Sequence, residues 1–186
     1  MIGQNEYFKL VTMGSGGLVE VADSRTDDDR RDAELYLRGQ FGFGLANQIK
    51  TTLRLHLSEG GSRYLYCKFH IRQERIVNHP CFWYFVAYLD PKLMRFADPV
   101  FLVPSTVMHT HGISGRDGNA VHFVLRANME PNARDLWVPY RVNTLDLGKR
   151  VLQVMKDLEK QQKHSKELLL SLPELGPDVI WLRKAA

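Results

Sequence analysis

The sequence predicts a single α/β domain in which helices flank a mixed β-sheet. Short segments with alternating or continuous hydrophobic residues, as in strands, recur between residues 18 and 126. Helical spacing of hydrophobic residues occurs near both ends, over residues 4–13 and after residue 143. The 186 residues fit one domain, with residues 1–166 as its body and residues 167–186 as a C-terminal arm.

The composition is that of an ordinary globular protein. Hydrophobic residues make up 44% and charged residues 25% of the chain, which excludes disordered and fibrous classes. No hydrophobic run approaches the ~20 residues of a spanning helix and no signal peptide is apparent, so we expect a cytoplasmic protein with no membrane partner. Two cysteines without CxxC spacing predict free thiols. The net charge of +4 is compatible with an anionic partner.

The N-terminal part predicts a helix, a strand and a loop. Residues 4–13 have helical spacing, and the glycine-rich residues 14–17 end that helix. Residues 18–22 alternate as a half-buried strand does. The polar residues 23–31 then predict a loop.

The next two strands bring polar side chains together. A strand that opens at Asp32 alternates, so that Asp32 and Glu34 share one face. A glycine-marked turn follows, and residues 45–52 form the returning strand with Gln48 and Lys50 on one face. If the two strands pair, all of these side chains lie on one surface.

The remainder of the chain predicts further strands and a terminal helix. The expected strands are residues 64–71, 82–89, 99–103 and 120–126. Residues 82–89 are hydrophobic throughout, as in a central strand that is covered on both faces. Residues 109–118 predict a loop, and a long helix begins near Asn143 or Thr144. The leucine-rich start of the C-terminal arm needs a surface to cover, on this domain or on a second copy, so a homodimer is compatible with it.

Asp32, Gln48 and Lys50 form a candidate site for phosphodiester hydrolysis. That reaction needs a divalent cation that offsets charge on the phosphate, and a polarised water. Asp32 and Gln48 supply oxygen ligands that suit magnesium. Lys50 lies on the same predicted face and would polarise the attacking water and stabilise developing charge. Glu6, on the first predicted helix, is a candidate additional metal ligand.

A second Gln-x-Lys triplet helps to test this interpretation. Residues 161–163 repeat the pattern Gln-Gln-Lys. They lie in a predicted helix, where side chains two residues apart point in different directions. Only the triplet from Gln48 to Lys50 therefore satisfies the geometry of the candidate site.

The order of these elements resembles the PD-(D/E)xK superfamily of restriction-endonuclease-like nucleases. The resemblance covers residues 3–52 and is strongest to Mrr-like and uncharacterised bacterial domains with glutamine before x-Lys. By resemblance, Asp32 matches the aspartate that opens the second core strand, Gln48 and Lys50 match the (E/Q)xK motif, and Glu6 matches the first-helix glutamate. It implies a restriction-endonuclease-like core and an endonuclease that uses Mg²⁺ or Mn²⁺ to hydrolyse nucleic acid, with DNA as the expected substrate.

The residues around the candidate aspartate depart from the family pattern. Arg30 and Arg31 precede it where the family often has glycine and an apolar residue, so Asp28 or Asp29 is the ligand if the strand starts earlier. Basic residues around the predicted active face are expected either to contact phosphates of nucleic acid or to be ordinary solvated surface. They are Arg30, Arg31, Arg38, Lys68, Arg72 and Arg75.

Two other functions stay open. A nuclease fold kept as a scaffold would bind nucleic acid or a partner protein without turnover, and the neutral Gln48 favours this alternative. His109 and His111, with His122 as a third ligand, would form a zinc or iron site if residues 109–118 are extended.

Overall fold

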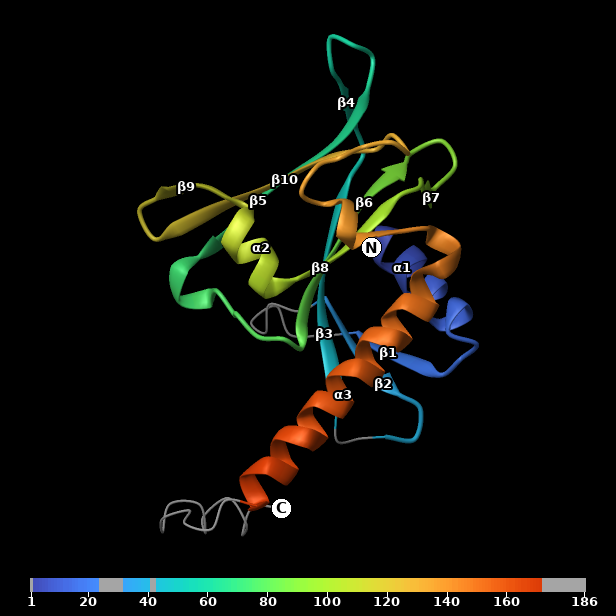
Figure 1. Cartoon of the computed structure of the whole chain (residues 1–186). Helices are drawn as coiled ribbons and strands as arrows, with labels where there is room; N and C mark the ends of the chain where they lie inside the picture. The colour runs from blue at the N-terminus through green and yellow to red at the C-terminus, as the bar shows by residue number, and fades with distance from the viewer. Residues whose placement is uncertain (1, 24–31, 41–42, 172–186) are drawn as a thin grey trace.

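The protein is built in three layers, as Figure 1 shows. A computed structural model describes residues 2–23, 32–40 and 43–171, with side chains to residue 162. Helices cover one face of a large β-sheet, and a smaller second sheet lies against its other face. The predicted α/β class with a mixed sheet flanked by helices is confirmed.

The large sheet has the strand order β1-β2-β3-β6-β8-β11, with β7 pairing with β6. The strands are β1 (Val19–Asp23), β2 (Ala33–Leu37), β3 (Gly44–Thr52), β6 (Phe82–Asp90), β7 (Arg95–Phe96), β8 (Val100–Pro104) and β11 (Arg141–Val142). All neighbouring strands are antiparallel except β3 and β6, which are parallel. Residues 82–87 of β6 are buried without interruption, which confirms the predicted central strand.

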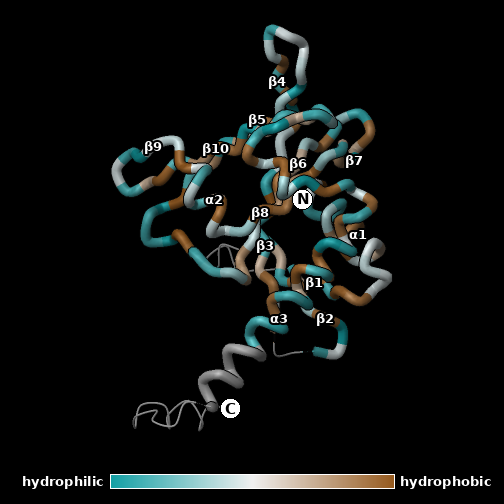
Figure 2. The backbone as a smooth tube through the Cα atoms, in the orientation of Figure 1, coloured by the Kyte–Doolittle hydropathy of each residue, from teal (hydrophilic) through white to brown (hydrophobic). Residues whose placement is uncertain are grey.

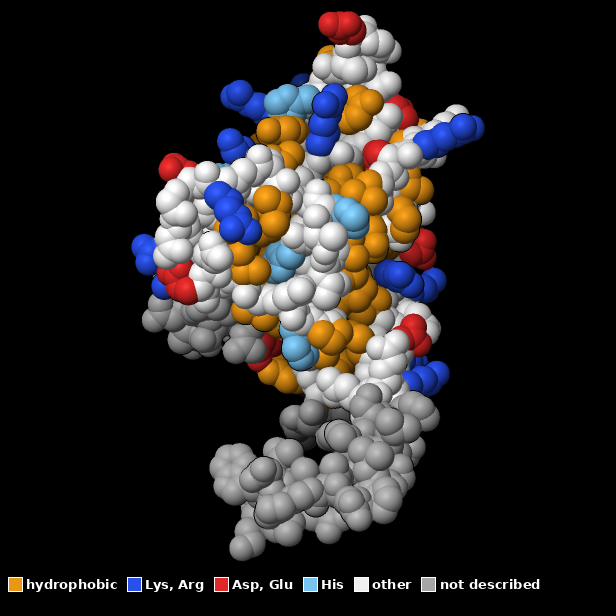
Figure 3. Space-filling model, turned by 60° about the vertical axis from the view of Figure 1, so that its left-hand side comes forward, with side chains coloured by type: hydrophobic (Ala, Val, Ile, Leu, Met, Phe, Trp, Pro, Cys, Tyr) orange, Lys and Arg blue, Asp and Glu red, His pale blue; other side chains and the backbone are white. Residues whose placement is uncertain are grey.

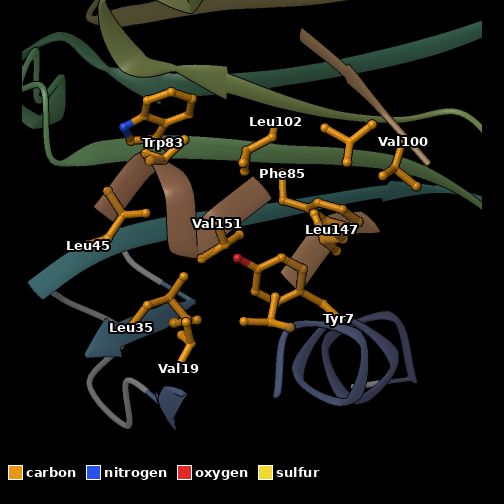
Figure 4. Packing of buried hydrophobic residues seen from close by; sticks show 14 of the residues in the cluster. Tyr7, Val19, Leu35, Leu45, Trp83, Phe85, Val100, Leu102, Leu147 and Val151 are labelled. Carbon is orange, nitrogen blue, oxygen red and sulfur yellow. The ribbon is translucent and has the colours of Figure 1, made fainter. Parts of the chain in front are cut away.

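Two helices cover one face of this sheet. They are α1 (Ile2–Gly14) and α3 (Leu147–Ser171), which follows the short η3 (Thr144–Asp146). Hydrophobic and hydrophilic residues alternate along the first part of α3 in Figure 2, as in a helix with one buried face. In Figure 4, the ring of Tyr7 lies among Leu35, Phe85, Leu147 and Val151. Burial raises the pKa of the Tyr7 hydroxyl far above its usual range.

The two helices cross in close contact at a pair of glycines. A Cβ atom added to Gly148 would lie 2.4 Å from the carbonyl carbon of Gly14 and 2.4 Å from the backbone nitrogen of Ser15. A side chain at either glycine would push the helices apart, so glycine fixes this crossing.

The second sheet covers the opposite face of the large sheet together with α2 (Ser105–His111). Its antiparallel strands have the order β4-β5-β10-β9, and they are β4 (Leu55–Leu57), β5 (Arg63–Arg72), β9 (Ile113–Asp117) and β10 (Ala120–Asn128). Two short helices, η1 (Gln73–Arg75) and η2 (Val138–Tyr140), lie in connecting segments. Side chains such as Leu65 and Phe123 pack against Tyr84 and Phe101 of the large sheet.

Some expected boundaries were wrong. Residues 109–118 are not a loop, because α2 runs to His111 and β9 then pairs with β10. The helix forms because Ser105 and Met108, three residues apart, share a buried face. The terminal helix crosses the predicted arm boundary and continues to Ser171, while residues 172–186 lie outside the described residues.

Within the described part of the chain, none of the helices combines the length and hydrophobicity needed to cross a membrane.

Candidate active site

The structure brings Asp32, Gln48 and Lys50 to one face of the large sheet. Ala33 of β2 pairs with Asn47 of β3 in antiparallel register, so Asp32 falls opposite Gln48. Residues such as Leu35 and Leu45 face the helices, and the alternation of side chains therefore turns the three polar residues toward the second sheet. The predicted arrangement of these strands is confirmed.

The carboxylate of Asp32 is held by the backbone of the Gln-x-Lys motif. Its Oδ2 accepts a hydrogen bond of 2.6 Å from the N–H of Ile49, the residue between Gln48 and Lys50. The N–H of Asp32 also donates to the carbonyl of Asn47 at 2.9 Å. Because β2 begins only at Ala33, this carboxylate occupies the place where a strand carbonyl would receive the Ile49 N–H. Asp32 is thereby fixed beside the motif.

Gln48 lines a cavity of ≈ 270 Å³ that is bordered by β3, β6, the end of β5 and η1. Three groups from the second sheet and η1, His70, Arg72 and Arg75, line the same cavity, and Tyr84 contributes an aromatic wall. An anion in this cavity would meet basic side chains beside the amide of Gln48.

The sequence predicted only part of this group of basic residues. Arg72 and Arg75 were expected near the predicted active face but could not be distinguished from solvated surface charges, and His70 carries no motif. Their convergence depends on β5 folding back beside β3, a long-range packing event that local patterns do not specify. The one available signal was the exposed, even-numbered positions of β5, which carry His70 and Arg72 at strand spacing.

Lys50 also lies between the sheets. Its Nζ is 5.4 Å from the centroid of the Phe69 ring of β5, within the range of a cation–π contact. Burial raises the pKa of the nearby Cys67 thiol to about 11, and the positive charge of Lys50 acts against that rise. The side chain of Lys50 is half-buried, which strengthens its interaction with an anion.

The chemistry of the donor set fits a hard cation such as magnesium. A carboxylate and an amide oxygen are ligands that Mg²⁺ prefers, and Mg²⁺ keeps several waters, so few protein ligands suffice. Glu34 follows Asp32 on the same face, and the hydroxyl of Tyr36 donates a hydrogen bond to its carboxylate. In the residues that the structure describes, no three His, Cys, Asp or Glu side chains form a group that could hold a metal ion.

Glu6 lies apart from this face, contrary to the expectation from the sequence. Its carboxylate is 3.6 Å from the Nζ of Lys9, and it lines a different cavity of ≈ 450 Å³ together with Arg95 and Thr144. That cavity lies beside α1, on the side of the sheet that the helices cover.

Gln4 is the residue of α1 that reaches Asp32. Its Nε2 donates to the backbone carbonyl of Asp32 at 3.0 Å and to Oδ1 of Asp23 at 2.8 Å. Positions 4 and 6 of a helix point in different directions, so when Gln4 faces Asp32, Glu6 cannot do so.

Arg38, one of the arginines expected near the active face, does not form part of the described site. Arg38 follows the opposite end of β2 from Asp32, which separates the two by about 20 Å along the strand. Its Nε lies 3.8 Å from the Glu20 carboxylate, and both side chains are exposed. Arg30 and Arg31 lie outside the described residues, as do the alternative ligands at positions 28 and 29.

The predicted histidine metal site is not formed. His109 and His111 lie in helix α2, where residues two apart diverge, whereas the hypothesis required an extended segment. The Nε2 of His109 is hydrogen bonded to the Tyr84 hydroxyl at 2.9 Å, and burial lowers the pKa of this imidazole. His122 instead contacts His70 on the second sheet, with ring centroids 6.1 Å apart.

Comparisons with known proteins give one structural neighbour to report. No family model matches the chain, and no curated protein matches its sequence. Among solved structures, the chain is similar to a bacterial homing endonuclease with 16% sequence identity and a TM-score of 0.49. The match covers 86% of this chain and 93% of the other.

Proposed function

We propose that this protein is a metal-dependent endonuclease of the PD-(D/E)xK type that hydrolyses phosphodiester bonds in nucleic acid, with DNA as the expected substrate. The observation that carries the proposal is the hydrogen bond from the Ile49 N–H to the Asp32 carboxylate. This hydrogen bond supports a site in which Asp32 acts together with Gln48 and Lys50.

Each residue has a separate role in the proposed reaction. Asp32 and Gln48 would hold Mg²⁺ or Mn²⁺, which when bound offsets the negative charge of the phosphate. Lys50 orients the attacking water and stabilises charge that develops on the phosphate oxygens. Arg72 and Arg75 line the cavity beside Gln48, where they attract a neighbouring phosphate.

Metal-dependent cleavage tests this proposal. Supercoiled plasmid, linear duplex, single-stranded DNA and RNA are each incubated with the protein in magnesium, in manganese and in EDTA. We expect cleavage of at least one substrate with a divalent cation and none in EDTA. Cleavage that persists in EDTA would contradict the metal-dependent mechanism.

The main alternative is a nuclease-like scaffold that binds nucleic acid or a partner protein without cleaving it. Two observations favour it: Gln48 is neutral, which weakens cation binding, and the Lys50 ammonium rests against the Phe69 ring. A protein that binds nucleic acid but cleaves no substrate with either metal would establish this alternative in place of the endonuclease.

A further inference from the structure

The second sheet buries one face and exposes the other. On β5 and β10, odd-numbered residues such as Leu65 and Phe123 enter the core, so the even-numbered side chains point outward. These outward side chains are mainly aromatic or basic, and we call this surface the outer face. Its principal residues are Tyr64, Tyr66, Lys68, His70, Arg72 and Arg126.

The outer face carries positive charge that forms no ion pair within the described part of the chain. The cross-strand neighbours of Lys68 and Arg72 are Val124 and Ala120, and Arg126 lies opposite Tyr66. Cations in a sheet commonly face carboxylates across the strands. In the described part of the chain these three cations form no ion pair with a carboxylate, and Asp117, at the end of β9, is the acidic residue that the register places on this face.

Aromatic rings lie between these cations and are held by their neighbours. Tyr66 is 36% exposed, and its ring makes an edge contact with His56 of β4 at a centroid distance of 5.2 Å. The guanidinium of Arg126 covers the ring of Tyr64 at 4.9 Å. In Figure 3, Lys, Arg and His side chains lie next to hydrophobic ones in the upper part of the view, at the height of β4. Tyr66 therefore presents an ordered ring that is partly open to solvent.

We propose that the outer face binds single-stranded nucleic acid. Unpaired bases would stack on Tyr66 and its neighbouring rings, while Lys68 and Arg126 bind phosphates. Outward residues of a strand repeat every ~6.6 Å, whereas bases in a duplex repeat every ~3.4 Å along each strand. Bases that follow these positions must be separated from one another, which an extended single strand permits and a duplex does not.

The outer face is continuous with the candidate active site. His70 and Arg72 belong to the outer face and also line the cavity at Gln48, because β5 ends beside β3 and β6. A single strand lying along β5 is therefore led toward Gln48 of the candidate site. This consequence rests on the proposed nuclease function and makes its substrate a nucleic acid with an unpaired segment, whereas binding to the outer face is independent of catalysis.

Equilibrium binding in EDTA tests the outer face without cleavage. Fluorescence anisotropy measures the affinity of the full chain for a labelled oligothymidine and for a duplex of equal length. We expect the single strand to bind more tightly. Tyr66→Ala weakens its binding about tenfold through loss of one stacking platform, and Tyr66→Phe, which keeps the ring, binds as the wild type does.

Charge variants provide a second readout that does not depend on whether the Tyr66 substitution disturbs the fold. Lys68→Ala should weaken single-strand binding and reduce the slope of log K against log salt concentration by about 0.7, the value for one phosphate contact. Lys149→Ala removes the same charge from an exposed position on α3, at 76% side-chain exposure, and should leave the slope unchanged.

The results separate this inference from the proposed function. Wild-type affinity in both Tyr66→Ala and Lys68→Ala would overturn the outer-face proposal, even if the protein cleaves nucleic acid. Tighter binding of the duplex, with the same losses in the variants, would also overturn it. Weaker single-strand binding in both variants would support the outer-face proposal even if no substrate is cleaved, because the binding is measured in EDTA and does not depend on cleavage.

Discussion

Replacing Asp32 should separate its structural role from its role in metal binding. In Asp32→Ala, the Ile49 N–H loses a charged acceptor at 2.6 Å. Hydrogen bonds to charged groups contribute about 1.5–3 kcal/mol, and the partial exposure of this one puts the expected loss at about 1.5–2 kcal/mol. In a protein of this size that corresponds to a melting temperature lower by about 3–8 °C.

Asp32→Asn is the matched control because it keeps an oxygen that can accept the Ile49 N–H. The charge is lost but a neutral hydrogen bond remains, so we expect the free energy of unfolding to fall by only about 0.5–1 kcal/mol. Both variants should nevertheless bind the cation more weakly, because each lacks the Asp32 carboxylate. A cation at ten times its Kd stabilises the folded state by about 1.4 kcal/mol, which only the wild type should show in full.

The assay is urea unfolding of the three proteins in EDTA and in magnesium. The expected order of stability in EDTA is wild type, Asp32→Asn, then Asp32→Ala. An unchanged stability of Asp32→Ala would refute the structural reasoning, and an undiminished magnesium effect in Asp32→Asn would refute the assignment of Asp32 as a metal ligand.

Three further predictions follow from the same structure. Gln48→Glu should retain or raise cleavage because it adds charge for the cation, whereas Gln48→Leu should lose cleavage in the same assay. Gly148→Ala should lower the free energy of unfolding in urea by about 1–3 kcal/mol, since its Cβ would overlap the backbone of α1; equal stability would contradict the close crossing. Burial lowers the pKa of His109 below its unfolded value, so stability should fall as pH drops below ~6.5. His109→Gln should show a smaller fall between pH 7.5 and 5.5, and parallel pH profiles would refute this.

The elements that follow from local patterns were predicted well. Residues 82–89 are hydrophobic throughout and form the central strand β6, and the alternation after Asp32 correctly placed its side chain on the face of Gln48 and Lys50. Side-chain period and turn position are local properties, so the sequence displays them directly. The predicted helix at residues 161–163, which excluded the second Gln-x-Lys triplet, is also confirmed.

The parts that depend on long-range packing were missed. After residue 53, the strands β5, β6, β8 and β10 were predicted one by one, whereas β4, β7, β9 and β11 were not. The division into two sheets depends on which residues pair far along the chain, as Phe69 does with Phe123. Glu6 was placed at the site from the order of elements, whereas the rotation of α1 about its axis presents Gln4 to Asp32 instead. That rotation is set by the burial of Tyr7 and Val11 against the sheet.

The most direct test of the proposed mechanism is the single-turnover cleavage rate of Lys50→Ala in magnesium, compared with the wild type and with Lys149→Ala. Loss of a preorganised charge partner should slow cleavage by ~10²-fold or more. The melting temperature should stay close to that of the wild type, because Lys50 is only half-buried. Lys149→Ala should cleave at the wild-type rate. Cleavage by Lys50→Ala at the wild-type rate would contradict the assignment of the active site.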